Sequence, residues 1–197
     1  MSSENSETRT RILKAAWPLL EASRGRGVKM GDIASAAGVS RQAVYLHFAT
    51  RADLLIATTH YVDEVNDVAG RLVASRTAAS GRDRLAAYVD AWGNYIPEIY
   101  GVAKALIAVQ DTDEAARLAW GDRLAAIREG FHAAAVALES DGVLARDFTV
   151  EEATDILWSL LSVQTWELLR LGCGWSQSDY IARVKRLAEK MLIEDPS

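Results

Sequence analysis

The fold of this chain is decided by the stretch Asp32–Phe48, which reads DIASAAGVSRQAVYLHF. Two short runs with helical spacing meet at Gly38, and glycine supplies the positive φ that a tight turn between helices needs. Two short helices joined by such a turn form a DNA-binding helix-turn-helix, whose second helix lies in the major groove. The alternative is a plain helical hairpin of a bundle. The positions expected to face inward are Ile33, Ala37, Val39, Val44 and Phe48.

The second of these helices carries an exposed polar face. At about 100° per residue, Arg41, Gln42 and Tyr45 fall within an arc of about 100° that faces away from Val44. Arginine can read guanine and glutamine can read adenine, while a tyrosine hydroxyl can donate to a phosphate. If the helices form a simple hairpin, this face is only solvated.

Phosphate contacts are expected where helices begin, because their first N–H groups are unpaired. Lys29 and Arg51 add positive charge beside the helix starts at Met30 and Arg51, and His47 is expected near a phosphate or in a structural role. The complete set of predicted DNA-binding residues is Lys29, Met30, Ser40, Arg41, Gln42, Tyr45, His47 and Arg51.

Helical spacing of apolar residues continues on both sides of this stretch. Helices are predicted over residues 8–23, 30–37, 41–47, 51–75, 82–95, 97–110, 113–140, 150–171 and 177–192. A loop is expected at 24–27, and a kink at Pro18, which cannot donate a backbone hydrogen bond. Ser40 and Ser176 are expected to cap helices, and Thr50 with Asp53 and Thr149 with Glu152 have capping-box spacing. No strand pattern competes, so we expect an all-α fold.

The charge distribution agrees with a DNA-binding head. The chain has a net charge of −5, yet residues 1–60 hold eight Lys and Arg against five Asp and Glu, a balance of +3. The remaining residues carry −8. A mildly basic N-terminal segment on an acidic body is typical of a local nucleic-acid footprint.

Several positions at fixed spacing resemble the tetracycline-repressor (TetR) family. They are Ile12-Leu13-x-Ala15-Ala16, Asp32-Ile33-Ala34-x-x-Ala37-Gly38-Val39-Ser40, Val44-Tyr45-x-His47-Phe48 and Arg51-x-x-Leu54-Leu55. The resemblance implies a three-helix DNA-binding head over residues 1–50 and a body of about six helices over 51–197, which binds a small-molecule effector and forms a homodimer. It further implies that the two heads of the homodimer bind a double-stranded, near-palindromic operator. The family usually has a threonine near the cap of its second helix, where this chain reads Val28-Lys29-Met30-Gly31, so no side-chain cap is evident there.

The predicted body is rich in aromatic residues, which suits a small hydrophobic or aromatic effector that releases a repressor from DNA. The predicted effector-binding residues are Trp92, Tyr95, Gln110, Trp158, Leu161 and Gln164. Core packing is the alternative for each aromatic. The helix at 150–171 and a stripe of Tyr180, Val184, Leu187 and Met191 on the last helix are expected to form the dimer interface.

No catalytic, metal-binding or cofactor-binding pattern stands out. The histidines His47, His60 and His132 are far apart, and the single cysteine, Cys173, excludes an internal disulfide. No signal peptide or membrane span is visible, so we expect a cytoplasmic protein. The main alternative is a helical adaptor or ligand-binding protein without DNA binding, and a small enzyme ranks behind it.

Overall fold

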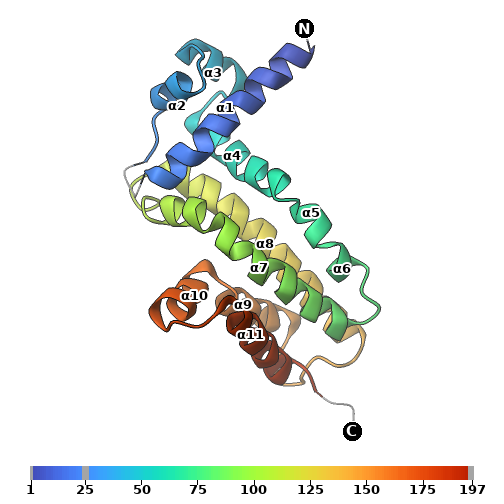
Figure 1. Cartoon of the computed structure of the whole chain (residues 1–197). Helices are drawn as coiled ribbons and strands as arrows, with labels where there is room; N and C mark the ends of the chain where they lie inside the picture. Colours follow the sequence, from blue (N-terminus) through green and yellow to red (C-terminus); the bar gives the residue numbers. More distant parts are fainter. Residues whose placement is uncertain (1, 24–26, 195–197) are drawn as a thin grey trace. The chain divides into compact units, whose positions relative to one another are not determined.

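The structure is a computed structural model that describes residues 2–23 and 27–194, and these residues form helices and no strand (Figure 1). The all-α prediction is confirmed. The loop predicted at 24–27 falls outside the described residues except for Gly27. The helices are α1 (Ser2–Ala22), α2 (Met30–Ala36), α3 (Arg41–His47), α4 (Arg51–Val65), α5 (Val68–Arg71), α6 (Val73–Arg76), α7 (Gly81–Ile107), α8 (Glu114–Ser140), α9 (Val150–Leu160), α10 (Val163–Glu167), the π-helical η1 (Leu168–Gly172) and α11 (Gln177–Leu192).

The described residues divide into two compact units. The first holds those up to Asn66 together with Ile99–Leu124, and the second holds Asp67–Glu98 together with the chain from Ala125 onward. Helices α7 and α8 therefore each contribute to both units. The functional boundary expected at residue 50 stays a prediction.

In the first unit, α1 packs against α2, α3 and α4 (Figure 1). Of the five apolar positions expected to face inward, Ile33, Ala37, Val44 and Phe48 are buried, whereas Val39 is half-buried. Gly38 has φ +64°, as the predicted turn requires. The caps are also confirmed: the Ser40 hydroxyl accepts from the Ala43 N–H, and Thr50 and Asp53 form a capping box. These local signals fix where the helices begin, and so they set the direction of α3.

The length predicted for the helix from Arg51 to about Ser75 is wrong. Helix α4 ends at Val65, and Asp67 takes the left-handed conformation with φ +50°. The Asp67 carboxylate accepts a hydrogen bond from the Gly70 N–H and so begins the separate short helix α5. The side chain competes with the helix for backbone donors, which is why aspartate favours such breaks.

The two helices predicted on either side of Pro97 are one, α7, which runs through the proline. A proline inside a helix leaves the carbonyl four residues earlier without its donor. That carbonyl belongs to Gly93, and it accepts a hydrogen bond of 2.9 Å from the Gln177 side-chain amide. A residue 84 positions away thus satisfies the group that Pro97 leaves unpaired.

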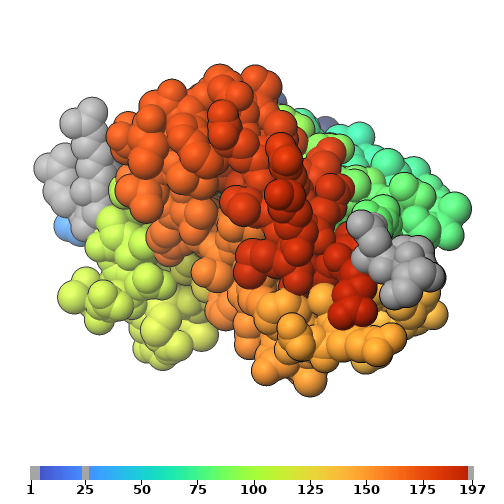
Figure 2. Space-filling model, turned by 90° about the horizontal axis from the view of Figure 1, so that it is seen from below, coloured from blue at the N-terminus to red at the C-terminus, as the bar shows by residue number. Residues whose placement is uncertain are grey.

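The continuous helix predicted over 150–171 is wrong as well, because it is broken after α9. The Ser162 hydroxyl accepts from the Thr165 N–H and starts α10, and η1 follows as a π-helical turn. The capping box of Thr149 with Glu152 and the Ser176 cap of α11 are confirmed. In the second unit α9 and α11 are in contact, and in Figure 2 the red atoms of α11 lie beside the orange atoms of the preceding part of the chain.

Candidate nucleic-acid interface

The predicted DNA-binding residues gather around the start of α2 and one side of α3. A hollow of about 490 Å³ lies between them in the first unit. Its lining residues are Gly27, Val28, Lys29, Met30, Gly31, Asp32, Arg41, Tyr45, Arg51 and Asp113. Five of the eight predicted residues are among these, so the structure brings most of the predicted set together.

No side chain accepts a hydrogen bond from the backbone N–H groups at the start of α2. Lys29 is the N-cap residue, with extended backbone angles and no side-chain cap, as its sequence predicted. Met30, the first residue of α2, is buried and lines the hollow. Unpaired N–H groups beside a lysine side chain can bind a phosphate, because both carry positive charge.

On α3, Arg41 and Tyr45 form one exposed unit. The guanidinium donates to the Tyr45 hydroxyl at 3.4 Å and lies over its ring, 5.7 Å from the centroid. Stacking of a guanidinium on an aromatic ring restricts both side chains while leaving the remaining guanidinium donors available. This arrangement suits contact with base edges or phosphates.

The other predicted residues of α3 lie outside the hollow. Ser40 holds the helix cap described above, Gln42 is exposed, and His47 is half-buried with its ring 6.4 Å from that of Phe48. Leu46, which sequence reasoning passed over, has 81% of its surface exposed. Its position on the helical wheel could have revealed this, since it lies two residues after the buried Val44.

Arg51 is held in place by partners within the protein. One guanidinium nitrogen lies 2.6 Å from both carboxylate oxygens of Asp113, and Nε donates to the Val28 carbonyl at 2.5 Å. The side chains are 26% and 18% exposed. A Cβ on Gly27, whose φ is +72°, would come within 3.2 Å of both charged groups, so glycine keeps this approach open. Asp113 lies 62 residues from Arg51, and no local signal in the sequence pairs them.

Asp113 also begins α8, because its carboxylate accepts from the Ala115 and Ala116 N–H groups. Partial burial acts to raise the pKa of Asp113, but the hydrogen bonds from Arg51 and from these two backbone groups outweigh it and hold the pKa below its ordinary value. The carboxylate is therefore charged at neutral pH and joins the start of α4 to the start of α8.

The predicted effector-binding residues are only partly brought together. In the second unit, the Trp92 indole donates to the Leu161 carbonyl at 2.8 Å, and its ring packs edge-on against Tyr95 at 6.0 Å. All three residues are buried. Trp158 is half-buried beneath the Arg128 guanidinium, and Gln164 is exposed. Gln110 belongs to the first unit and is half-buried.

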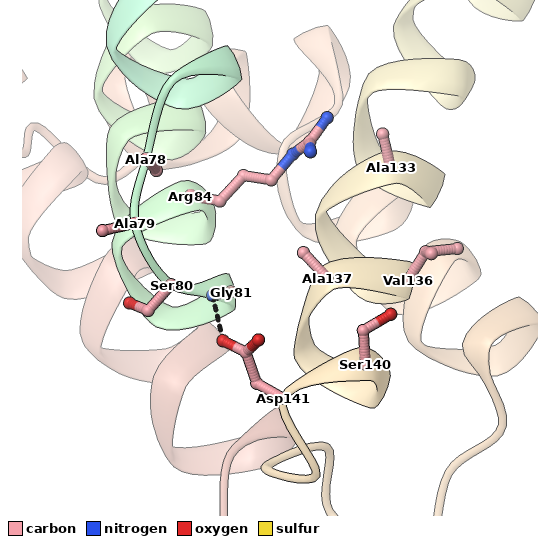
Figure 3. Close-up of a pocket in the computed structure, with 10 residues that line it drawn as sticks. All are labelled: Ala78, Ala79, Ser80, Gly81, Arg84, Ala133, Val136, Ala137, Ser140 and Asp141. Carbon is pink, nitrogen blue, oxygen red and sulfur yellow. Dashed lines mark hydrogen bonds between the residues drawn. The ribbon is translucent and has the colours of Figure 1, made fainter.

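The second unit has a hollow of about 280 Å³ between the start of α7 and the end of α8, which Figure 3 shows. The Gly81 N–H donates to the Asp141 carboxylate there at 2.6 Å, and the Arg84 side chain extends toward α8. A Cβ on Gly81 would lie 2.5 Å from the Ala137 backbone, so the two helices meet closely at this glycine. None of the predicted effector-binding residues lines this hollow.

No helix in residues 2–23 and 27–194 is long and apolar enough to cross a membrane. Over the same residues, no group of three or more His, Cys, Asp or Glu side chains is arranged to hold a metal ion.

Comparison with known proteins agrees with this geometry. Residues 12–58 match the family described as "Bacterial regulatory proteins, tetR family". The HTH-type transcriptional regulator CymR of Pseudomonas putida is 29% identical over 159 residues, which are 79% of this chain and 75% of CymR. The nucleoid occlusion factor SlmA of Marinomonas sp. is 33% identical over 64 residues, and the match spans only about a third of each protein, 32% of both.

The fold itself is shared over nearly the whole chain. A crystal structure of a TetR-family transcriptional regulator from Rhodococcus sp. has a TM-score of 0.74 at 24% identity, covering 95% of this chain and 99% of that one. A transcriptional regulator from Saccharomonospora viridis, solved with choline, has a TM-score of 0.73 at 23% identity, covering 96% and 100%. Residues 12–58 thus match the DNA-binding segment of the tetR family of bacterial regulatory proteins, and the chain shares its all-helical fold with the solved regulators.

Proposed function

We propose that two copies of this chain bind a near-palindromic operator, with α3 of each copy in the major groove, and that a small-molecule effector releases them. The observation that carries the DNA-binding part is the pairing of an exposed Arg41–Tyr45 unit on α3 with the uncapped first turn of α2 beside Lys29. Side chains for base edges and donors for phosphates thus lie on one hollow of the head, as groove binding requires.

Each predicted residue takes a role in this proposal. Arg41 and Gln42 contact base edges. Lys29, the Met30 N–H, Tyr45 and His47 contact phosphates, and Ser40 holds α3 by its cap. Arg51 adds positive charge to the hollow, but its bonds to Asp113 and Val28 support a second role in fixing the chain that leads into α2.

For the effector, we propose a small hydrophobic or aromatic compound. Trp92, Tyr95 and Leu161 support this, since they form a buried, linked group in the second unit. Trp158, Gln164 and Gln110 stay in the proposal as further contacts. The solved relative that carries choline supports only the general point that a protein of this fold can hold a small organic ligand.

The test is selection of duplexes from random DNA by the full chain, followed by titration of the selected duplex and a scrambled one at two salt concentrations. Phosphate contacts release counterions, so six or more contacts should weaken binding by about 10³-fold or more between about 50 and 200 mM salt. The selected duplex should bind far more tightly than the scrambled one at both concentrations. A helical adaptor would select no duplex, and that outcome would exclude the proposed function.

A further inference from the structure

Leu46 is a large apolar side chain on the outer surface of α3, and it does not pack into the core of the head. With 81% of its surface exposed, it is the most exposed of the large hydrophobic residues among those the structure describes. Apolar surface on the solvent-facing side of this short helix is not stabilised by the protein core. A role in binding would account for it.

The direction of Leu46 follows from its distance to the buried Val44. At about 100° per residue, positions two before and two after Val44 each project about 160° away from it and about 40° apart from each other. These positions are Gln42 and Leu46, and both are exposed. Arg41 and Tyr45 lie nearer the core, about 60° and 100° from Val44. The outermost ridge of α3 is therefore the pair Gln42 and Leu46.

If α3 enters a major groove, this ridge meets the base edges first. The groove offers one apolar group, the C5-methyl of thymine, and the amide of glutamine can pair with adenine N6 and N7. The four residues from Gln42 to Leu46 correspond to a rise of about 6 Å along the helix, while base pairs are about 3.4 Å apart. The two side chains can therefore reach the same base pair or neighbouring ones.

We propose that Leu46 is a specificity-determining residue that contacts a thymine methyl in each half of the operator, within about two base pairs of the adenine contacted by Gln42. The inference rests on the proposed DNA-binding function and adds to it the base that this side chain selects. Leu46 has no hydrogen-bonding group, so the methyl is the only feature of the base that it can distinguish.

The test uses the full chain and its selected operator, with each thymine replaced in turn by deoxyuridine, which lacks only the methyl. For the unsubstituted protein, one replacement in each half-site should weaken binding by about three- to tenfold, the effect of one buried methyl. Leu46→Ala should bind the original operator more weakly and lose its sensitivity at that position alone. Val73→Ala, which shortens another exposed apolar residue on α6, should keep the original pattern.

Each outcome of this experiment supports or overturns the proposed role of Leu46. An operator whose thymine methyls can all be removed without effect, or a Leu46→Ala protein that keeps the sensitivity, overturns the role of Leu46 and leaves DNA binding intact. Failure to select any duplex overturns both proposals. Equal binding of Leu46→Ala and the unsubstituted protein to scrambled DNA shows that the variant is folded, as expected for a residue outside the core.

Discussion

Two positively charged residues of the hollow, Lys29 and Arg41, differ in what surrounds them. Lys29 stands at the start of α2, where the nearby unpaired groups are backbone N–H donors. Arg41 projects from α3 and is braced by the Tyr45 ring. A charge beside backbone donors suits a phosphate, which every sequence has, whereas a braced guanidinium with free donors suits guanine.

Separate alanine substitutions should distinguish these roles. Lys29→Ala should weaken binding to cognate and scrambled duplexes by similar factors and lower the salt slope by about one. Arg41→Ala should cost about 1–3 kcal/mol on the cognate duplex and relax the preference at one operator position. Fluorescence anisotropy at several salt concentrations measures both effects. If the two variants lose affinity equally for cognate and scrambled DNA, Arg41 does not read a base.

Features of single residues could be predicted from the sequence where they depend on nearby residues in the chain. The Ser40 cap and the Gly38 turn each depend on neighbours within a few positions, and both were predicted. The exposure of Leu46 could also have been derived from helical geometry. The pairing of Arg51 with Asp113 could not, because it depends on how distant parts of the chain fold together.

At the scale of elements, the Arg51–Asp113 pair connects three helix starts: the chain entering α2, the first residue of α4 and the N-cap of α8. All of these lie in the first unit. An ion pair of this kind, mostly shielded from water and supported by backbone donors, contributes more than an exposed one. It therefore fixes the chain that enters α2 relative to the starts of α4 and α8.

Asp113→Asn should lower the free energy of unfolding by about 1–3 kcal/mol at neutral pH, because it removes the charge from these hydrogen bonds. The pKa of Asp113 is lowered in the folded state, so its contribution is fully present above the ordinary value of 3.8 and is lost as the pH falls through the folded value. The difference in free energy of unfolding between Asp113→Asn and the unsubstituted protein should thus be widest at neutral pH and should narrow as the pH falls below about 4. Urea denaturation across this range measures it.

Asp111→Asn is a matched control, because Asp111 is exposed and two residues from Asp113. It should leave the free energy of unfolding nearly unchanged. A gap between Asp113→Asn and the unsubstituted protein that stays constant down to pH 3 would show that the pair is not the source of the difference.

The errors in predicted helix bounds have two causes, one tertiary and one local. Pro97 was expected to divide a helix, but Gln177 from α11 supplies the hydrogen bond that the proline prevents. Ser162 was expected inside a helix, but its hydroxyl begins a new one. A tertiary partner therefore lets α7 continue through the proline, whereas a cap within three residues starts a new helix at the serine.

At the scale of the whole molecule, the apolar stripe predicted on the last helix has two parts. Tyr180 and Val184 are fully buried inside the second unit, whereas Leu187 and Met191 are 44% and 43% exposed. Leu168 and Leu171 on η1 are more exposed still, at 63% and 59%. A stripe that only completed the core of one chain would be buried throughout. Exposed apolar residues on these segments support the proposed dimer.

Replacing Leu187 and Met191 together by glutamate should therefore shift the protein toward monomers, because charges would be buried without partners at the interface. Sedimentation equilibrium of the full chain should show at least a tenfold weaker dimer, and circular dichroism should show unchanged helix content, since both residues lie outside the core of the unit. The monomer should still bind a single half-site weakly but lose the tight binding to the full operator, because the two heads then act independently. Val73→Glu, which alters an exposed apolar residue on α6, serves as the control and should leave the dimer intact. A double variant that stays dimeric would place the contact between copies elsewhere on the chain.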